Sequence, residues 1–282
     1  MSDAVTFVHL TDLHIGEPGT PDDHLYADTT GNLRAILADV KRMDPAPAFI
    51  VASGDLTNRG DVPSYRHLQA VLAEAELPMP VLFALGNHDK RDGFYEAVLD
   101  RTEDNMAPYD HDHVIAGMHV IVLDSSVPGK IGGAFEAGQL DWLRDRLDDH
   151  PELPKLLVMH HAPALDEDNA EMEWESLTIA DTQALRDLLD DYEVVGILSG
   201  HIHFDRVSNW YGIPVVVGIG QHAGTDVLAM PHALRMVEAA SFAVGTLRPS
   251  GLSISFVPQP ATRRELHVID MEQMRKYLAA AE

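Results

Sequence analysis

Cysteine is absent from this chain of 282 residues, which excludes disulfide bonds and thiolate metal ligands together. Any bound metal must be held by oxygen and imidazole nitrogen, the ligands that suit Mn, Fe, Zn, Co or Mg. The sequence also lacks an apolar run near the roughly 20 residues that a membrane-spanning helix needs. Residues Met1–Asp3 show neither the basic nor the apolar region of a signal peptide. We therefore expect a cytoplasmic protein with no membrane partner.

Positive charge is scarce as well, since 20 Lys and Arg face 45 Asp and Glu for a formal net charge of −25. Such a surface repels phosphate backbones at long range, which argues against a duplex nucleic acid partner. A small phosphorylated substrate is not excluded, because bound metal ions reverse the charge locally. The composition is that of a globular protein, and we predict a single domain over residues 1–282.

Five short apolar runs, each of strand length, end in residue types that bind metals. The central run, residues 81–85, is followed by Gly86-Asn87-His88-Asp89. The other four runs precede Asp12 and His14, Asp55, His160 and His161, and His201 and His203. Each group alone could be a turn or surface decoration. Because the groups recur at the ends of buried strands, where α/β sheets carry their chemistry, we expect them to meet at one edge.

The donors in these groups are too many for one tetrahedral zinc ion. They are Asp12, His14, Asp55, Asn87, His160, His201 and His203. Residues i and i+2 of an extended chain point the same way, so Asp12 and His14 are predicted to share a face, as are the paired histidines. Buried carboxylates and imidazoles cost several kcal/mol each unless they are paired or bind a metal. The set therefore favours two metals that share a carboxylate, for which Asp55 is our candidate.

Apolar periodicity predicts the remaining elements. Helices are expected over about 29–43, 63–75, 92–99, 139–147 and 178–189. Strands are expected over 48–52, 114–116, 118–123, 206–210, 214–219, 241–247 and 252–257. The alternation of strand and helix up to residue 99 predicts parallel pairing in that part. From about residue 241 to 282 we expect a β-rich and helical extension, with a final helix over 271–282 that caps the domain or contacts an oligomer partner.

Two further features leave alternatives open. The acidic segment 166–176 carries Trp174, which either packs on the core or belongs to a lid over the site. Among the remaining histidines, His222 follows an apolar run and is a candidate to face the site. The others are expected to be solvated: His24, His67, His111, His113, His119, His150 and His232.

Taken in order, the motifs resemble the calcineurin-like metallophosphoesterase superfamily, whose pattern is D-x-H, G-D, G-N-H-[DE], H and G-H-x-H. The matching blocks are Asp12-x-His14, Gly54-Asp55, Gly86-Asn87-His88-Asp89, His160 and Gly200-His201-Ile202-His203. The resemblance implies an α/β fold, a four-layer α/β/β/α sandwich of two mixed β-sheets flanked by helices. It assigns one metal to Asp12, His14, Asp55 and His203, and the second to Asp55, Asn87, His160 and His201. His160 is chosen over His161 because the family's ligand is the first histidine after the strand.

The resemblance also implies a mechanism that uses two divalent or trivalent ions, with Mn, Fe or Zn ahead of Co or Mg. A hydroxide that bridges the ions, both bound by Asp55, attacks phosphorus in line. Asn87 and His88 offset charge on the transition state, and His88 is the candidate general acid for the leaving oxygen. Asp89 is expected to orient an imidazole.

Looser matches are similar to bacterial class III cyclic nucleotide phosphodiesterases and the related glycerophosphodiesterases. They are residues 86–91, 123–129, 139–143 and 160–163. They imply a small diester substrate, a 3′,5′-cyclic nucleotide or a glycerophosphodiester, and a homodimer or larger homo-oligomer. One alternative is a phosphomonoesterase or broad phosphatase, for whose dianionic substrate Lys90, Arg91 and Lys130 are the nearby cations. The remote alternative is a non-catalytic binding scaffold, which the complete ligand set disfavours.

Overall fold

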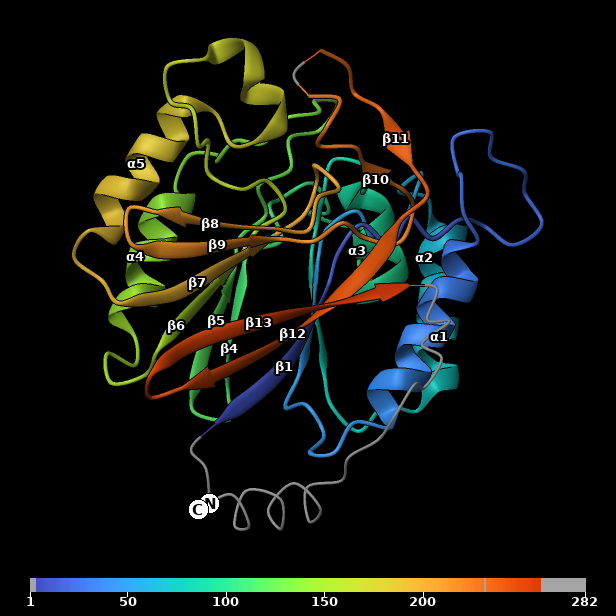
Figure 1. Cartoon of the computed structure of the whole chain (residues 1–282), viewed down its shortest axis with the longest axis horizontal. Helices are drawn as coiled ribbons and strands as arrows, with labels where there is room; N and C mark the ends of the chain where they lie inside the picture. The colour runs from blue at the N-terminus through green and yellow to red at the C-terminus, as the bar shows by residue number, and fades with distance from the viewer. Residues whose placement is uncertain (1–3, 231, 260–282) are drawn as a thin grey trace, which may run out of the picture.

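The computed structural model of the chain describes residues 4–230 and 232–259. Its strands form two mixed sheets that lie between two groups of helices (Figure 1). The four-layer architecture expected from the sequence is thereby confirmed. The expected helix over 271–282 lies outside the described residues.

The first sheet has the strand order β13-β12-β1-β2-β3. Its strands are β1 (Val5–Leu10), β2 (Ile50–Ser53), β3 (Val81–Ala84), β12 (Ala240–Arg248) and β13 (Gly251–Gln259). β1, β2 and β3 pair in parallel, as the alternation of strands and helices predicts, whereas β12 returns antiparallel to β1. Three helices flank this sheet: α1 (Thr29–Lys41), α2 (Val62–Ala75) and α3 (Arg91–Leu99).

The second sheet has the order β4-β5-β6-β7-β9-β8. Its strands are β4 (His111–Ile115), β5 (Met118–Val122), β6 (Lys155–Val158), β7 (Val194–Ser199), β8 (Arg206–Trp210) and β9 (Ile213–Val217). The central pairs are parallel, and hairpins form both edges. Helices α4 (Gln139–Asp148) and α5 (Ile179–Leu189) flank it, and η1 (Ala170–Glu175) is a short 3-10 helix. A small hairpin joins β10 (Gly224–Thr225) to β11 (Met236–Val237).

Apolar residues on both faces of the strands divide the core into three clusters. Phe7 stacks on Phe49 with ring centroids 5.2 Å apart, in the cluster that also contains Val120 and Val158 of the second sheet. Val8 and Ile50, one residue along, pack instead with the helices of the first sheet. A third cluster joins α4 and α5 to the second sheet. The central parallel strands are mostly buried and largely apolar, because the other sheet covers one of their faces and helices cover the other.

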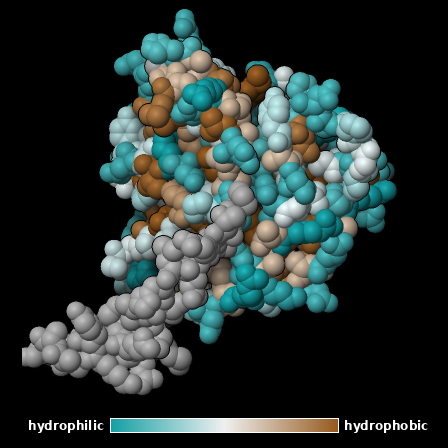
Figure 2. Space-filling view, turned by 45° about the vertical axis from the view of Figure 1, so that its right-hand side comes forward, coloured by the Kyte–Doolittle hydropathy of each residue, from teal (hydrophilic) through white to brown (hydrophobic). Residues whose placement is uncertain are grey.

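The face seen in Figure 2 is largely hydrophilic, with patches of apolar residues between the hydrophilic ones. In the described ranges, no helix combines the length and the apolar content that crossing a bilayer requires.

Arg91, suggested by the sequence as a cation near the substrate, is instead a buried link between the halves of the fold. Its Nε donates to Asp124 Oδ2 at 2.9 Å, and Nη1 donates to Glu136 Oε1 at 2.5 Å. Further bonds reach the carbonyls of Met106 and Ser126 at 2.9 and 2.8 Å. Arg91 begins α3 beside the first sheet, whereas Asp124 follows β5 of the second. The expectation that Arg91 could face a substrate is wrong, because its donors are already occupied.

We expect Arg91→Met to lower the free energy of unfolding by about 3–5 kcal/mol, because it leaves the Asp124 carboxylate buried without its partner. Urea denaturation measures this loss. The matched control is Arg34→Met, which removes an exposed pair with Glu74 and should cost at most about 1 kcal/mol. Equal losses in the two variants would contradict a structural role for Arg91.

Candidate metal centre

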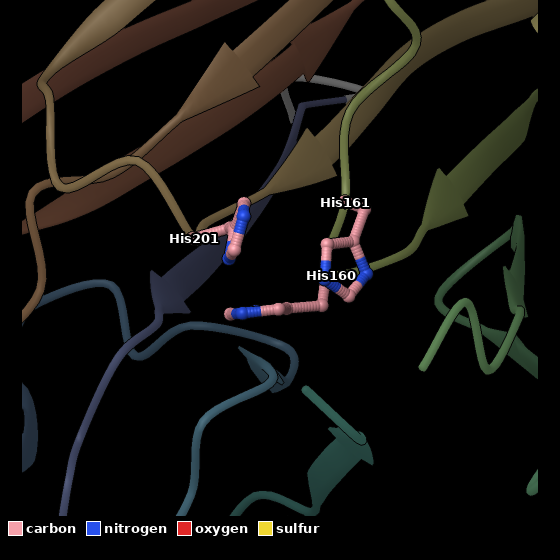
Figure 3. A group of neighbouring side chains, drawn as sticks. All are labelled: His160, His161 and His201. Atoms are coloured by element: carbon pink, nitrogen blue, oxygen red, sulfur yellow. The ribbon is translucent and has the colours of Figure 1, made fainter. Parts of the chain in front are cut away.

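The predicted site residues follow β1, β2, β3, β6 and β7, and these strands belong to two different sheets. The site therefore lies where the ends of the two sheets meet, and the expectation of a single sheet edge needs this correction. Figure 3 shows three of the side chains, His160 and His161 after β6 and His201 after β7, gathered around one space. The ligand atoms of these three lie within 4.8 Å of one another.

The chain bends sharply at these positions. Asp12, His14, Asp55, His201 and His203 all have positive φ, between 44° and 76°. The sequence argument from an extended chain is therefore wrong, since these residues lie beyond the strands in the left-handed region. Asp and His occur there more often than most side chains, although each such residue costs about 1–3 kcal/mol. The bends still bring Asp12 and His14 together, and their ligand atoms lie within 4.8 Å of that of His203.

Glycines of the motifs allow close packing around the carboxylates. A Cβ at Gly86 would collide with the Asp55 carboxylate, and a Cβ at Gly200 would collide with Thr11 and Asp12. These glycines are required because another group already occupies the space of a side chain.

Asp55 lies at the middle of the site and is buried. Its Oδ2 is 3.3 Å from His160 Nε2 and 3.7 Å from His14 Nε2, while Oδ1 accepts the His88 backbone N–H at 2.8 Å. Burial would raise the pKa of Asp55, but the imidazoles around it, His160 first, hold that pKa well below its usual range. The position between two rings is the one that a shared ligand would need.

Three of the imidazoles are oriented by hydrogen bonds on the side away from the carboxylates. His14, His160 and His203 each use Nδ1 toward an oxygen, which leaves Nε2 directed at Asp55 or Asp12. The oxygens are Asn58 Oδ1 at 2.9 Å, the Ser53 carbonyl at 2.9 Å and the Ala223 carbonyl at 2.7 Å. The Nε2 atoms of His14 and His160 are buried and have no hydrogen-bond partner. An imidazole whose Nδ1 is fixed in this way leaves its Nε2 available as a ligand for a metal, which would displace any proton there.

The buried carboxylates favour the protonated form of a neighbouring imidazole. Burial would lower the pKa of His160, but the Asp55 carboxylate raises it to about 9. Burial likewise favours the neutral form of Asp12, yet His203 holds the pKa of Asp12 below its usual range. Two buried carboxylates surrounded by oriented imidazoles form a donor set that fits divalent cations.

His201 and Asn87 face each other across the site. His201 Nε2 donates to the Trp174 carbonyl at 2.7 Å, so its Nδ1 carries the lone pair and points at Asn87 Oδ1, 2.8 Å away. Both facing atoms are acceptors, which suits two ligands of one ion better than a mutual hydrogen bond. The backbone N–H of His201 also donates to the Asp12 carboxylate, at 3.1 Å to Oδ1.

His160 and His161 differ in their hydrogen-bond partners. His161 Nδ1 lies 2.9 Å from the Ser125 hydroxyl, and Nε2 lies 2.9 Å from the Ile131 carbonyl, so both nitrogens are occupied. Its ring is only 4.5 Å from that of His201, but no lone pair remains for an ion. The geometry therefore favours His160, the residue that the sequence motif selected.

A cavity of about 210 Å³ opens over these side chains. Six predicted site residues line it: His14, Asp55, Asn87, His88, His201 and His203. Its apolar lining is formed by Ile131, Trp174, Ile202, Phe204, Met230, Leu234 and Met236. Among the described residues that line it there is no Lys or Arg, and Lys90 and Lys130 are exposed outside it. The cations expected for a dianionic substrate are therefore not at the site.

Trp174 belongs to the wall of this cavity. Its side chain is 36% exposed, so packing on the core is wrong, and its carbonyl is bonded to His201. Of the acidic residues in segment 166–176, only Glu175 lines the cavity. Glu167 pairs with Arg186, which directs it away from the site.

Asp89 does not orient an imidazole, contrary to the expectation from the sequence. Its carboxylate accepts backbone N–H groups of Leu56 and Gly86, at 3.0 and 2.9 Å, and the Tyr65 hydroxyl at 2.8 Å. Asp89 thus ties its own loop to the loop that carries Asp55. Asp89 therefore positions the backbone of these two loops and not an imidazole.

Asn58 was missed by the sequence reasoning. Its Oδ1 accepts from His14, its carbonyl lies 3.0 Å from His88 Nδ1, and its Nδ2 donates to Asp22 at 2.7 Å. The only available signal was its position three residues after Asp55, in a turn that the motif does not cover. Asn58 orients both imidazoles.

Two further histidines face the cavity. His222 is buried there with its ring 4.7 Å from that of His14, which settles the open question about this residue. His24 is exposed, as expected, and also lines the same cavity. His119, also expected to be solvated, is buried in β5 and pairs with Asp112 at 2.7 Å. The burial of His119 could not be read from the sequence, because it depends on what covers β5, whose five residues are all buried in the folded protein.

Comparison with known proteins agrees with this arrangement. Residues 5–205 match the family described as calcineurin-like phosphoesterase. A probable cyclic nucleotide phosphodiesterase of Rhodococcus erythropolis is 35% identical over 215 residues, which cover 74% of this chain and 68% of that protein. A cAMP/cGMP dual specificity phosphodiesterase of Mycobacterium tuberculosis is 33% identical over 74% of this chain and 65% of that protein. A purple acid phosphatase from yellow lupin (Lupinus luteus) seeds has a similar fold, with a TM-score of 0.68 at 16% identity over 96% of this chain and 53% of that one.

Proposed function

This chain belongs to the calcineurin-like phosphoesterase family, and we propose that it hydrolyses a small phosphodiester, of the 3′,5′-cyclic nucleotide or glycerophosphodiester type, at a centre of two metal ions. The observation that carries the proposal is the cavity in which oriented imidazoles and buried carboxylates form the polar part and no Lys or Arg is present among the described lining residues. The similarity to proteins named cyclic nucleotide phosphodiesterases supports the same substrate class.

The donor set divides naturally between two ions that share Asp55. Asp12, His14 and His203 would complete one site, and Asn87, His160 and His201 the other. When bound, such ions supply Lewis acidity for phosphoryl transfer and lower the pKa of water. Mn, Fe and Zn suit these nitrogen and oxygen ligands.

His88 is the residue that we assign to proton transfer. Its Nδ1 lies 3.0 Å from the Asn58 carbonyl and donates to it, so its other ring nitrogen is left for the cavity that His88 lines. A proton held there can pass to the leaving oxygen as the P–O bond breaks. Its backbone N–H, bonded to Asp55, keeps the ring beside the metal ligands. Asn87 offers its amide to the same space.

A diester suits this cavity better than a monoester. A monoester dianion requires more positive charge than a diester monoanion, and protein cations usually supply it. The described lining contains none. The apolar lining also provides contacts for two organic ester groups. We therefore place the phosphomonoesterase alternative second, and the complete donor set argues against a non-catalytic scaffold.

The test is hydrolysis of bis-p-nitrophenyl phosphate and of p-nitrophenyl phosphate at matched concentrations. We expect a preference for the diester of about tenfold or more in kcat/KM, since one missing charge contact is worth roughly 1.4 kcal/mol or more. Activity should disappear after treatment with a chelator and return with Mn. A preference for the monoester would move the assignment to a phosphatase, and activity that survives metal removal would contradict the metal centre.

A further inference from the structure

The hairpin formed by β10 and β11 is a separate wall of the cavity. Its described residues are 224–230 and 232–237, and its strands pair Gly224 with Val237 and Thr225 with Met236. In Figure 1 it lies at the same end of the molecule as η1. The family match ends at residue 205, before this hairpin begins.

Hydrogen bonds attach the base of the hairpin directly to a predicted metal ligand. The Thr225 N–H donates to the His203 carbonyl at 2.9 Å, and His203 Nδ1 donates to the Ala223 carbonyl at 2.7 Å. Farther along, the Asp226 N–H donates to the Arg235 carbonyl at 2.8 Å, and the two side chains pair at 3.2 Å. The position of the hairpin is therefore fixed relative to the ions that His203 would help to hold.

Apolar side chains of the hairpin face both the cavity and the solvent. Met230, Leu234 and Met236 line the cavity, although Leu234 is 58% exposed and Met236 is 38% exposed. Leu228, on the same hairpin, is 90% exposed and does not line the cavity. Apolar side chains at the mouth of a polar site gain free energy only when an apolar group covers them. Methionine is well suited to this task because its flexible thioether adapts to flat or irregular groups.

We propose that this hairpin binds one organic ester group of the substrate, and that Met230, Leu234 and Met236 select diesters whose ester group carries a flat ring, such as an aryl ring or the base of a nucleoside. The inference rests on the proposed phosphodiesterase function. It deepens that function by naming the residues that distinguish one diester from another. Trp174 and Ile131, which line the same cavity, supply further apolar surface.

The experiment compares two diesters that release the same p-nitrophenol. Bis-p-nitrophenyl phosphate carries a second aryl group, whereas methyl p-nitrophenyl phosphate carries a methyl group in its place. The ratio of their kcat/KM values isolates the contribution of the second ester group. In Leu234→Gln and Met236→Gln we expect this ratio to fall about five- to tenfold, the range for loss of an apolar contact in a pocket.

The matched control is Leu228→Gln, which makes the same chemical change on the same hairpin outside the cavity and should leave the ratio as in the wild type. Metal content and thermal midpoint, measured for every variant, separate a change in selectivity from a loss of folding. An unchanged ratio in both cavity variants, or an equal fall in Leu228→Gln, would overturn the inference while the phosphodiesterase function stands. A wild-type protein that hydrolyses neither diester would overturn both.

Discussion

In Asp55→Ala we expect the loss of bound metal and a fall in kcat/KM toward bis-p-nitrophenyl phosphate of at least about 1,000-fold. The reason is that Asp55 Oδ2 faces both His14 and His160, so one substitution would remove a ligand from both ions and several kcal/mol of transition-state stabilisation with them. Metal analysis of the purified variant and steady-state kinetics measure the two effects. An Asp55→Ala protein with full activity and two bound ions would refute the shared centre.

Two controls make this result interpretable. Asp100→Ala removes a carboxylate from an exposed residue whose φ of 51° matches the 48° of Asp55, so it reproduces the backbone cost without touching the site. It should keep metal and activity. Asp55→Asn keeps an acceptor for the His88 N–H but removes the charge. Its activity should stay close to that of Asp55→Ala if the charge of the shared ligand is what matters.

His88→Ala should give the second large effect, but with a different signature. We expect metal content to remain at the wild-type level while kcat falls by about 100- to 10,000-fold for alkyl diesters, the range for loss of a general acid. The fall should be smaller for nitrophenyl esters, because p-nitrophenolate leaves without a proton. Metal analysis together with kcat for the two classes of diester tests this combination.

A loss of metal in His88→Ala would change the interpretation. The His88 ring lies near enough to His14 and Asp55 for the three to hold an ion, so such a loss would make His88 a ligand. An equal fall in kcat for both classes of diester would contradict the proton-transfer role. His113→Ala, an exposed histidine of β4, serves as the matched control and should change neither quantity.

The sequence was sufficient for the architecture because its signals are local. Apolar runs that end in Asp12, Asp55, Asn87 and His160 define strand ends, and all five helices begin at or within one residue of the positions that periodicity predicts. The family resemblance supplied the pairing of the strands into two sheets. The sequence alone had suggested one edge, because apolar periodicity does not reveal which strands are neighbours.

What the sequence could not supply depends on contacts between distant segments. Asn58, His24 and His222 approach the centre only after the chain has folded, and no spacing rule connects them. The hairpin strands are two residues long, too short for any periodicity to predict. Asp89 was misread because a carboxylate beside a histidine suggests an imidazole partner, whereas the buried N–H groups of two loops required an acceptor more strongly. The assignment of individual metal ligands stays a prediction that the substitutions above test.

The left-handed backbone at five of the predicted site residues also bears on how this protein can evolve. Glycine would adopt the same conformation at Asp12, His14, Asp55, His201 and His203 without the cost that these side chains carry. Replacement by glycine would thus relieve strain and remove a functional group in a single step. Backbone conformation and side-chain role are therefore opposed at these positions, because the left-handed backbone favours glycine whereas the buried carboxylate–imidazole contacts and the proposed metal ligation require the side chain. Substitution at these five positions is therefore constrained by the role of the side chain and not by the backbone conformation.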